Sequence, residues 1–245
     1  MLTVPPIGIV VALPAEARTV VRQRLEFESL HELPGGHWLT VSGAGPENAH
    51  GAASRLLDHN VEGLMSWGCA AAIAHHLLPG QLVLPEVVLD EEGHAHAADS
   101  AWLRRLSTSL PSGLLSHGGH LIESARVVGT RAAKASLHTS TGAIAVDMES
   151  GAIARIARAR CVPFLAVRAI ADSAAMDVPR AVSRALNPRG DVRTAVLLAQ
   201  LALHPLQIGE LIALGRAFGA ALRTLYQVRR AAGSDFRFIA PPEPR

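Results

Sequence analysis

The chain has 245 residues, which is enough for one α/β domain with a substantial core. Hydrophobic residues make up 49% of the chain and charged residues 18%, a balance that argues against overall disorder. The net charge of +2 comes with scattered basic residues and no aromatic platform, so nucleic-acid binding is not expected. Cys69 and Cys161, the two cysteines, lie in apolar runs and predict buried thiols in a reducing compartment without a disulfide.

The N-terminal stretch predicts a first β-strand and not a targeting segment. It lacks a basic region and a cleavage site, and prolines interrupt its apolar run. No segment reaches the roughly 18 uninterrupted apolar residues of a membrane span. We therefore expect a soluble, cytoplasmic protein.

The remaining elements predict an α/β fold. Short β-branched runs bounded by glycine or proline predict strands at residues 7–13, 38–42, 63–67, 82–89, 144–148 and 164–170. Ala-rich patterns predict helices at residues 16–25, 47–59, 150–160 and about 194–230. This alternation favours a three-layer α/β/α arrangement with a mixed central sheet. We expect a single domain over residues 1–232, followed by an extended or disordered proline-rich tail at residues 233–245.

Acidic residues stand where predicted strands end, which is where α/β enzymes place their catalytic groups. Asp147 and Glu149 flank the turn from a strand into a helix, so one can cap the helix while the other faces a site. Asp172 follows a buried strand that contains Arg168, a potential partner. Asp172 is therefore a candidate for proton transfer.

Two further features lie near the N-terminus. Glu16 follows the first predicted strand, and taken alone it reads as a solvated glutamate in the first turn of a helix. The stretch "SGAGPENAHGAA" presents glycines before Pro46, which is typical of backbone N–H groups offered to an anion or a sugar. It does not fit the dinucleotide fingerprint, because Asn48 stands where the third glycine is required.

Read in order, these stretches resemble the nucleoside phosphorylase and nucleosidase superfamily. The matching pieces are "IGIVVALPAE", "SGAGPENA", "SWGCAAA", "LPGQLVLPE", "VDMESGAIA" and "VRAIAD", which cover about residues 5 to 175. The methylthioadenosine/S-adenosylhomocysteine nucleosidases are similar to the chain, and the hopanoid-associated phosphorylases resemble it most. The resemblance implies a nucleoside phosphorylase-like fold, a homodimer and no cofactor. It also implies cleavage of a 5′-substituted adenosine, such as adenosylhopane, that releases adenine.

The resemblance also implies roles for individual residues. Asp172 matches the acid that protonates N7 of the purine, and Glu16 matches the glutamate that activates water. Glu149 matches the glutamate that binds the ribose hydroxyls, and Met148 matches the methionine beneath the sugar. The remaining substrate-binding candidates are Val127, Val128, Cys69, Gly68 and Arg168, and Val127 stands where many members have a stacking phenylalanine.

The chain departs from the family pattern in its third motif, and it leaves open whether water or phosphate attacks the sugar. "GCAAA" replaces Gly-Ser-Ala-Gly-Gly, so Cys69 stands for a serine and methyl groups are added at Ala71 and Ala72 of this predicted loop. Phosphate is a potential co-substrate, because Arg126, Arg131 and Arg168 are potential anion ligands. A carboxylate at Glu16 would repel phosphate and activate water instead. Both reactions stay open at this point.

Other functions have weaker support. The chain has no G-x-S-x-G for a serine hydrolase. His75 and His76, or His94, His96 and Asp99, could form a metal site, but such loop histidines are usually solvated, so no metal is expected. A non-catalytic nucleoside binder is an alternative. The basic amphipathic pattern at residues 208–230 predicts core packing or a dimer face, and alternatively a peripheral membrane contact for a lipid-linked substrate.

Overall fold

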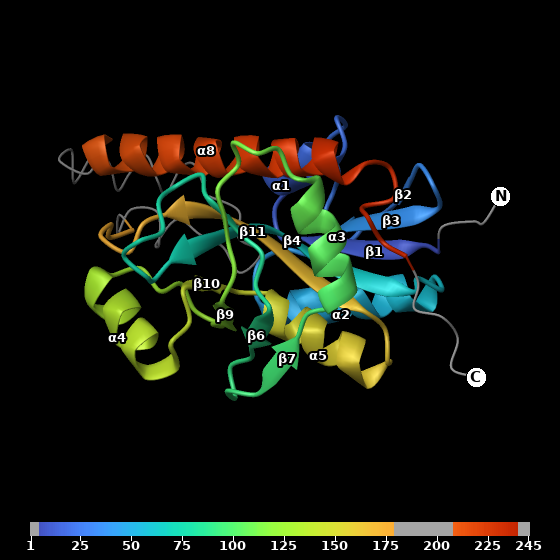
Figure 1. Ribbon diagram of the computed structural model, residues 1–245, viewed down its shortest axis with the longest axis horizontal. Helices are drawn as coiled ribbons and strands as arrows, with labels where there is room; N and C mark the ends of the chain where they lie inside the picture. Colours follow the sequence, from blue (N-terminus) through green and yellow to red (C-terminus); the bar gives the residue numbers. More distant parts are fainter. Residues whose placement is uncertain (1–4, 179–207, 240–245) are drawn as a thin grey trace.

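The computed structural model describes residues 5–178 and 208–239, which form a mixed β-sheet with helices on both faces (Figure 1). In chain order the elements are β1 (Ile7–Val11), α1 (Pro14–Val20), β2 (Leu30–Leu33), β3 (His37–Val41), α2 (Pro46–Asp58), β4 (Gly63–Ala72), β5 (Leu82–Val83), β6 (Val87–Leu89), β7 (Ala95–Ala97), α3 (Ser100–Ser109), β8 (Ser116–His117), β9 (His120–Glu123), α4 (Arg131–Thr141), β10 (Ala145–Asp147), α5 (Ser150–Ala159), β11 (Phe164–Asp172) and α8 (Ile208–Ala232). The predicted α/β class and mixed sheet are confirmed.

The order of the strands brings two strand ends together. The sheet runs β2-β3-β1-β4-β10-β9-β6-β7, and β11 pairs with β4 and β5. β1 runs parallel to β4 up to the Val10–Ser66 pair, whereas β10 runs antiparallel to β4 from Ala145–Ala72 to Val146–Ala71. The carboxyl ends of β1 and β10 therefore approach the same stretch of β4, residues 67–70, from opposite directions.

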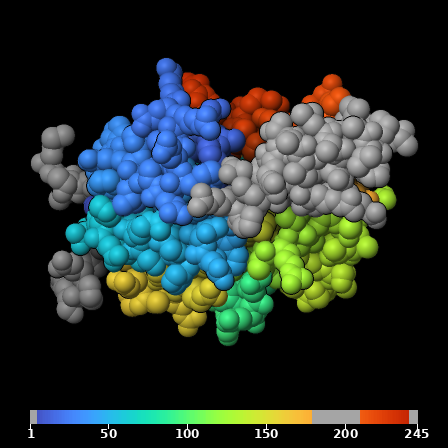
Figure 2. Space-filling view, turned by 180° about the vertical axis from the view of Figure 1, so that it is seen from behind, coloured from blue at the N-terminus to red at the C-terminus, as the bar shows by residue number. Residues whose placement is uncertain are grey.

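Alternation along the central strands builds the two helical layers. Ile9 and Val11 of β1 pack in the core that α1, α3 and α8 cover, whereas Val10 packs in the core that α2 and α5 cover. β11 splits in the same way, with Val167 on the first face and Ala166 on the second. Figure 1 shows α8 along one side of the sheet and α2 and α5 along the other. Figure 2 shows the molecule from behind, with the yellow α5 and the yellow-green α4 on the same lower side.

The strands differ from their predicted bounds in two places. The run at residues 82–89 is split into β5 and β6, because Pro85 has no N–H to donate to a ladder. β4 continues to Ala72, so the "GCAAA" stretch is the end of a central strand and not a loop. The side chains of this stretch are small. β4 is hydrogen-bonded to β11 here, and the side chains of Arg168 and Glu16 pass close to Gly68.

The C-terminal part of the chain was predicted less well. α8 packs Leu225 and Val228 into the core, which supports core packing for its buried face, and residues 194–207 of the predicted helix lie outside the described residues. The prediction of an extended or disordered tail is wrong for residues 233–239. Phe236 and Phe238 are buried there, and the indole N–H of Trp102 donates to the carbonyl of Phe236 at 2.8 Å. Residues 240–245 lie outside the described residues.

Three other sequence predictions can be compared with the structure. Among the described residues, no helix combines the length and the apolar character that crossing a bilayer requires. Both cysteines are free, and Cys69 is partly buried, but Cys161 is exposed, so the prediction of a buried thiol is wrong for Cys161. Cys161 lies with φ of 53° in the turn that ends α5, where the chain is open to solvent. The homodimer and the membrane contact stay predictions.

Candidate active site

A cavity of about 230 Å³ lies where β1, β10 and β11 end beside β4. It is lined by Ala12, Leu13, Glu16, Ala44, Cys69, Ala70, Ala71, Arg126, Val127, Val128, Val146, Asp147, Met148, Glu149, Ala171, Asp172 and Val178. The described fold therefore brings together all four acidic residues that the sequence singled out, although they are up to 156 residues apart in the chain.

Glu16 is buried at the start of α1 and is held by three backbone N–H groups. Its Oε2 accepts from Ala12 at 3.1 Å and Leu13 at 2.9 Å, and its Oε1 accepts from Cys69 at 2.8 Å. The Cys69 N–H is available because neither β1 nor β10 pairs with that part of β4. Burial raises the pKa of Glu16 above its ordinary value, and the positive charge of Arg168 opposes this rise. The interpretation of Glu16 as a solvated glutamate is therefore wrong.

Gly68 provides the space in which Glu16 and Arg168 come close together. A Cβ at this position would lie 2.6 Å from Nη1 of Arg168 and 2.7 Å from Oε1 of Glu16. Any side chain there would have to displace one of the two charged groups. Gly68 thus shapes the site from beneath, and it is not among the residues that line the cavity.

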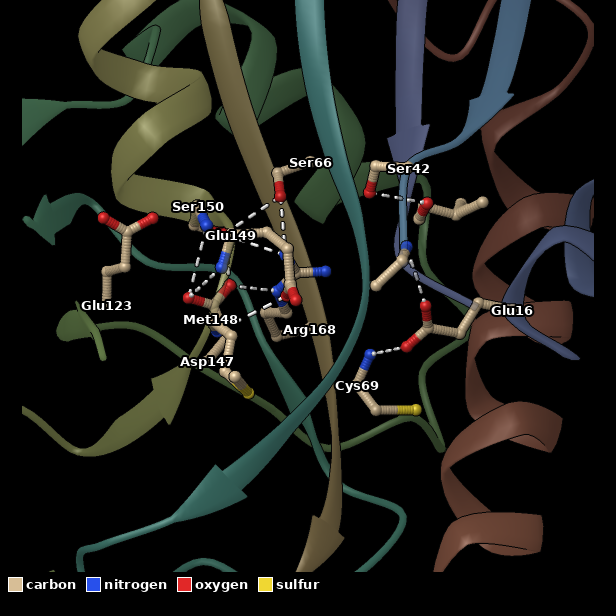
Figure 3. Close-up of polar contacts among 12 residues, drawn as sticks. Glu16, Ser42, Ser66, Cys69, Glu123, Asp147, Met148, Glu149, Ser150 and Arg168 are labelled. Carbon is tan, nitrogen blue, oxygen red and sulfur yellow. Dashed lines mark hydrogen bonds and ion pairs between the residues drawn. The ribbon is translucent and has the colours of Figure 1, made fainter. Parts of the chain in front are cut away.

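Cys69 contributes its backbone more than its thiol. Burial raises the pKa of the Cys69 thiol well above its ordinary value, and the nearby charge of Glu16 raises it further. The thiol therefore stays protonated at neutral pH, which does not suit a nucleophile. In Figure 3 its backbone nitrogen points toward Glu16.

Arg168 is buried behind Asp147 and Glu149, two of the acids that line the cavity. Its Nε donates to Asp147 Oδ2 at 2.6 Å, and its Nη2 donates to the hydroxyls of Ser66 at 2.6 Å and Ser150 at 3.0 Å (Figure 3). Nη2 also lies 3.8 Å from Glu149 Oε2. Burial acts to lower the pKa of Arg168, but the neighbouring carboxylates outweigh it and raise the pKa.

The pairing of Arg168 with Asp172 is therefore not observed, and geometry explains why. Arg168 precedes Asp172 by four residues along β11, which separates their Cα atoms by about 13 Å in an extended strand. Arg168 aligns with Gly68 in the middle of β4 and faces Asp147, whereas Asp172 lies at the strand end beyond a bulge.

Asp147 and Glu149 divide the two roles that their spacing predicted. Asp147 Oδ1 accepts from the backbone N–H of Ser150 at 3.3 Å at the start of α5, while its Oδ2 binds Arg168. Glu149 lines the cavity, and its Oε1 accepts from the Gly45 N–H at 3.1 Å. Burial raises the pKa of Glu149 to about 8, and the charge of Asp147 adds to this rise. Glu149 can therefore carry a proton near neutral pH.

Asp172 has a partner that sequence reasoning missed. The ammonium group of Lys134, from α4, donates to Asp172 Oδ2, and Lys134 is fully buried. Burial raises the pKa of Asp172 above its ordinary value, whereas Lys134 acts to lower it. One signal was present in the sequence, because Lys134 is the only lysine of the chain.

Met148 and Val127 stand between the cavity and a wider chamber of about 940 Å³. The chamber shares Ala44, Val127 and Met148 with the cavity, and it is also lined by Gly45, Pro46, Glu47, Asn48, His50, Glu91, Glu92, Ala125 and Arg155. Val127 is 44% exposed, and Val128 lines the cavity alone. Both valines leave the wall of the cavity aliphatic where many relatives are expected to have an aromatic ring.

The potential phosphate ligands are dispersed. Arg126 is exposed and lines the cavity, whereas Arg168 is engaged by Asp147. Arg131 binds Asp177 through Nε at 3.3 Å and does not line the cavity. The structure therefore does not bring the three arginines together around one anion.

The residues considered for a metal site do not come together as predicted, although Nδ1 of His94 lies 3.4 Å from Asp90 Oδ2, the oxygen that His96 also contacts. His75 and His76 are exposed, and Asp99 caps α3 by accepting from the Trp102 N–H at 2.7 Å. Nε2 of His96 lies 3.0 Å from Asp90 Oδ2. In the described part of the chain, one group has potential ligand atoms within 4.8 Å of one another, formed by Asp90, Glu92 and His94, and two of its members are exposed.

Comparisons with known proteins agree with the fold. The family model described as phosphorylase superfamily matches residues 6–187. The 5′-methylthioadenosine/S-adenosylhomocysteine nucleosidase of Neisseria meningitidis, solved with methylthio-immucillin-A, has a TM-score of 0.71 at 17% identity, over 94% of this chain and 99% of that chain. The corresponding nucleosidase of Colwellia psychrerythraea, solved with adenine, has a TM-score of 0.69 at 15% identity, over 94% of this chain and 96% of that chain. Futalosine hydrolase of Helicobacter pylori has a TM-score of 0.67 at 15% identity, over 95% of this chain and 97% of that chain. A search of the curated proteins found no match.

Proposed function

The chain belongs to the phosphorylase superfamily, and we propose that it hydrolyses the N-glycosidic bond of a 5′-substituted adenosine and releases adenine. The observation that carries the proposal is the distribution of acids in one cavity. Asp172 lies at one end with a pKa raised by burial, and Glu16, Asp147 and Glu149 surround Arg168 at the other end. This distribution suits a bond whose cleavage leaves negative charge on the base and positive charge on the sugar.

In the proposed reaction Asp172 is the general acid. As the C1′–N9 bond breaks, its electron pair passes into the purine, and Asp172 transfers its proton to N7. Adenine then leaves as a neutral molecule. The raised pKa keeps Asp172 protonated to a higher pH than an exposed aspartate, so the proton is available before the bond breaks.

Glu149 and Met148 are proposed to hold the ribose, and Glu16 to activate water. Glu149 faces the cavity and is anchored on the Gly45 N–H, which leaves its carboxyl group suited to the 2′- and 3′-hydroxyls. Glu16 takes a proton from water as the water oxygen bonds to C1′. Burial strengthens Glu16 as a base, since it raises its pKa above the ordinary value. The products are adenine and a 5-substituted ribose.

Water is favoured over phosphate by the charges at the sugar end. Three acids meet one buried cation there, and that cation already binds Asp147. Among the described side chains, a phosphate dianion would meet the carboxyl groups of Glu16, Asp147 and Glu149 and no free buried cation, and of the described arginines only the exposed Arg126 lines the same cavity. An uncharged water molecule needs no such cation.

The wider chamber favours a large, polar 5′-substituent. If Glu149 binds both ring hydroxyls, the 5′-carbon is the remaining point at which a substituent can leave the sugar toward the chamber. Glu47, Glu91, Glu92 and Arg155 line that chamber. A hopane skeleton would remove water from these charged groups without replacing its hydrogen bonds. An amino-acid substituent, as in S-adenosylhomocysteine, could form hydrogen bonds with them, so we propose this class ahead of adenosylhopane.

The test is adenine release from S-adenosylhomocysteine, methylthioadenosine and adenosylhopane in detergent, each with and without phosphate. We expect the highest kcat/KM for S-adenosylhomocysteine, no dependence on phosphate, and a 5-substituted ribose with a free hydroxyl at C1′ as the sugar product. A 5-substituted ribose 1-phosphate as product would overturn hydrolysis. Preference for adenosylhopane would overturn the polar substituent, and binding of adenine without cleavage of any of the three would leave a nucleoside-binding protein.

A further inference from the structure

Lys134 is buried in a way that core packing does not explain. It is the one buried residue of α4, and it is fully covered although its neighbours Arg131 and Ala135 are exposed. A lysine is rarely buried completely unless its charge is paired. It is also the only lysine among the 23 basic residues of the chain, all others being arginine.

The ammonium group of Lys134 has three donors, and three acceptors surround it. They are Asp172 Oδ2, the carbonyl of Ser173 at 2.8 Å and the carbonyl of Met176 at 2.9 Å. A compact ammonium group can turn its three donors toward three converging oxygens, whereas the guanidinium of arginine holds its donors in one rigid plane. Lys134 thus joins the proposed acid to the segment that follows β11.

That segment forms a wall of the cavity, and α4 together with the residues just before it fixes the segment at three points. Besides Lys134, the backbone N–H of Arg131 donates to Asp177 Oδ1 at 2.6 Å, and the N–H of Val178 donates to the Gly129 carbonyl at 2.7 Å. Val178 itself lines the cavity. The start of α4 and the end of β11 therefore behave as one structural unit beside Asp172.

We propose that Lys134 is a positioning residue for Asp172. Lys134 orients the carboxyl group of Asp172 toward the purine and stabilises the carboxylate that remains after proton transfer. This inference rests on the proposed function. Before the transfer Lys134 binds a neutral acid, and after it a charged one. A charged ammonium group is attracted more strongly to a carboxylate than to a neutral carboxyl group. Lys134 therefore favours the transition state over the bound nucleoside.

Other charged groups near Asp172 are placed differently. Arg126 from the β9–α4 connection lines the same cavity and is exposed, and Glu16 and Glu149 lie at the sugar end. In the described part of the chain, Lys134 is the one charged side chain that is hydrogen-bonded to Asp172. Removing its charge should therefore change the titration of Asp172 more than removing any of the others.

The experiment compares the wild type with Lys134→Met, which removes the charge at similar length. We expect kcat/KM for adenine release to fall about 10- to 100-fold. We also expect the pH at which kcat/KM is lost on the alkaline side to rise by about one unit in Lys134→Met, because the cation no longer lowers the pKa of Asp172. Arg131→Met is the matched control, since it removes an exposed charge from the same helical turn, and it should leave both quantities near the wild-type values. Lys134→Gln keeps a donor without the charge and serves if the methionine variant does not fold.

Carbon NMR titration of the Asp172 carboxyl, assigned with Asp172→Asn, measures the same effect without turnover. A higher pKa in the Lys134 variants supports the pairing even if the wild type cleaves no nucleoside, in which case the proposed function alone fails. An unchanged pKa of Asp172 overturns the inference. A fall in kcat/KM that follows only a lowered Tm, without a change in the pH profile, also overturns it and leaves Lys134 a structural role.

Discussion

The two ends of the cavity hold acidic and basic groups in different proportions. At the Asp172 end one acid meets one lysine, and the ammonium group is saturated by three oxygens. At the Arg168 end one arginine meets three acids, Asp147, Glu149 and Glu16. The first arrangement allows one proton to move while the total charge stays small. The second has more carboxyl groups than cations, and those that are ionised stabilise positive charge that develops beside them.

This difference matches the needs of the two halves of a nucleoside. The base must accept a proton as it leaves, and the sugar gains positive charge at the same moment. Both ends use burial to raise carboxyl pKa values, but Lys134 opposes the rise at one end and Asp147 adds to it for Glu149 at the other. Single substitutions can alter one end at a time.

Asp172→Asn should have the largest effect, because an amide keeps the shape of the side chain and has no proton to give. We expect adenine release to fall by about 10² to 10⁴ in kcat. Asp177→Asn is the matched control, since Asp177 is exposed, binds Arg131 and lies five residues away. Equal losses in the two variants would contradict the assignment of the acid.

Gly68→Ala tests the close approach of the two charged groups at the sugar end. The added methyl group would lie 2.6 Å from Arg168 and 2.7 Å from Glu16, so one of them must move. We expect a loss of about 1–3 kcal/mol in the free energy of unfolding, together with reduced turnover. Gly51→Ala in α2, where the nearest atom is the flexible end of Arg55 at 3.6 Å, should be tolerated. Similar unfolding curves for both variants would show that the space at Gly68 is not needed.

The pH dependence of stability reports on Glu149. Its pKa is about 8 in the folded protein and near 4.5 when unfolded, so between these values the folded state holds a proton that the unfolded state has released. Stability should therefore fall as the pH rises from about 5 to 8. Glu149→Gln should show a smaller drop in Tm over this range, but not none, because burial also raises the pKa of Glu123 to about 7. An unchanged drop in Tm would contradict the raised pKa of Glu149, and Glu47→Gln, at an exposed position, is the control.

Val127→Phe should have the smallest effect, and it should be a gain. Val127 lines the cavity and is 44% exposed, so a ring has space to stack on the purine. Such stacking contributes about 0.5–1.5 kcal/mol, which lowers KM by about 2- to 10-fold. Val127→Leu adds apolar volume without a ring, and an equal change in that variant would show that stacking is not the cause.

The strands and the acidic residues at their ends could be predicted from the sequence, because the signals for both lie within short stretches of the chain. β-Branched runs bounded by glycine and proline determine strands, and Glu149 and Asp172 follow such runs directly. The resemblance then joined stretches that are far apart in the chain. Gly68 and Glu16 were identified in the same way, although the contact between them and Arg168 depends on the register of β1, β4 and β11.

The basic residues that pair with these acids could not be predicted from such short stretches. α4 is rich in Ala, Ser and Thr and has no apolar stripe, so periodicity did not predict it, and its one buried residue is a lysine. Arg168 was assigned to Asp172 because the two are close in sequence, but Asp147, which lies 21 residues away, is its partner. The tail was misjudged because its prolines at residues 241, 242 and 244 obscured Phe236 and Phe238, which fill the core beside Trp102.

The most direct measurement follows the oxygen atom that reaches C1′. The wild type is incubated with S-adenosylhomocysteine in ¹⁸O-water without phosphate, and the masses of both products are measured by mass spectrometry. We predict free adenine and a ribose product that carries one ¹⁸O at C1′. Recovery of the intact nucleoside, with no free adenine and no labelled sugar, would contradict the claim that this cavity breaks the N-glycosidic bond.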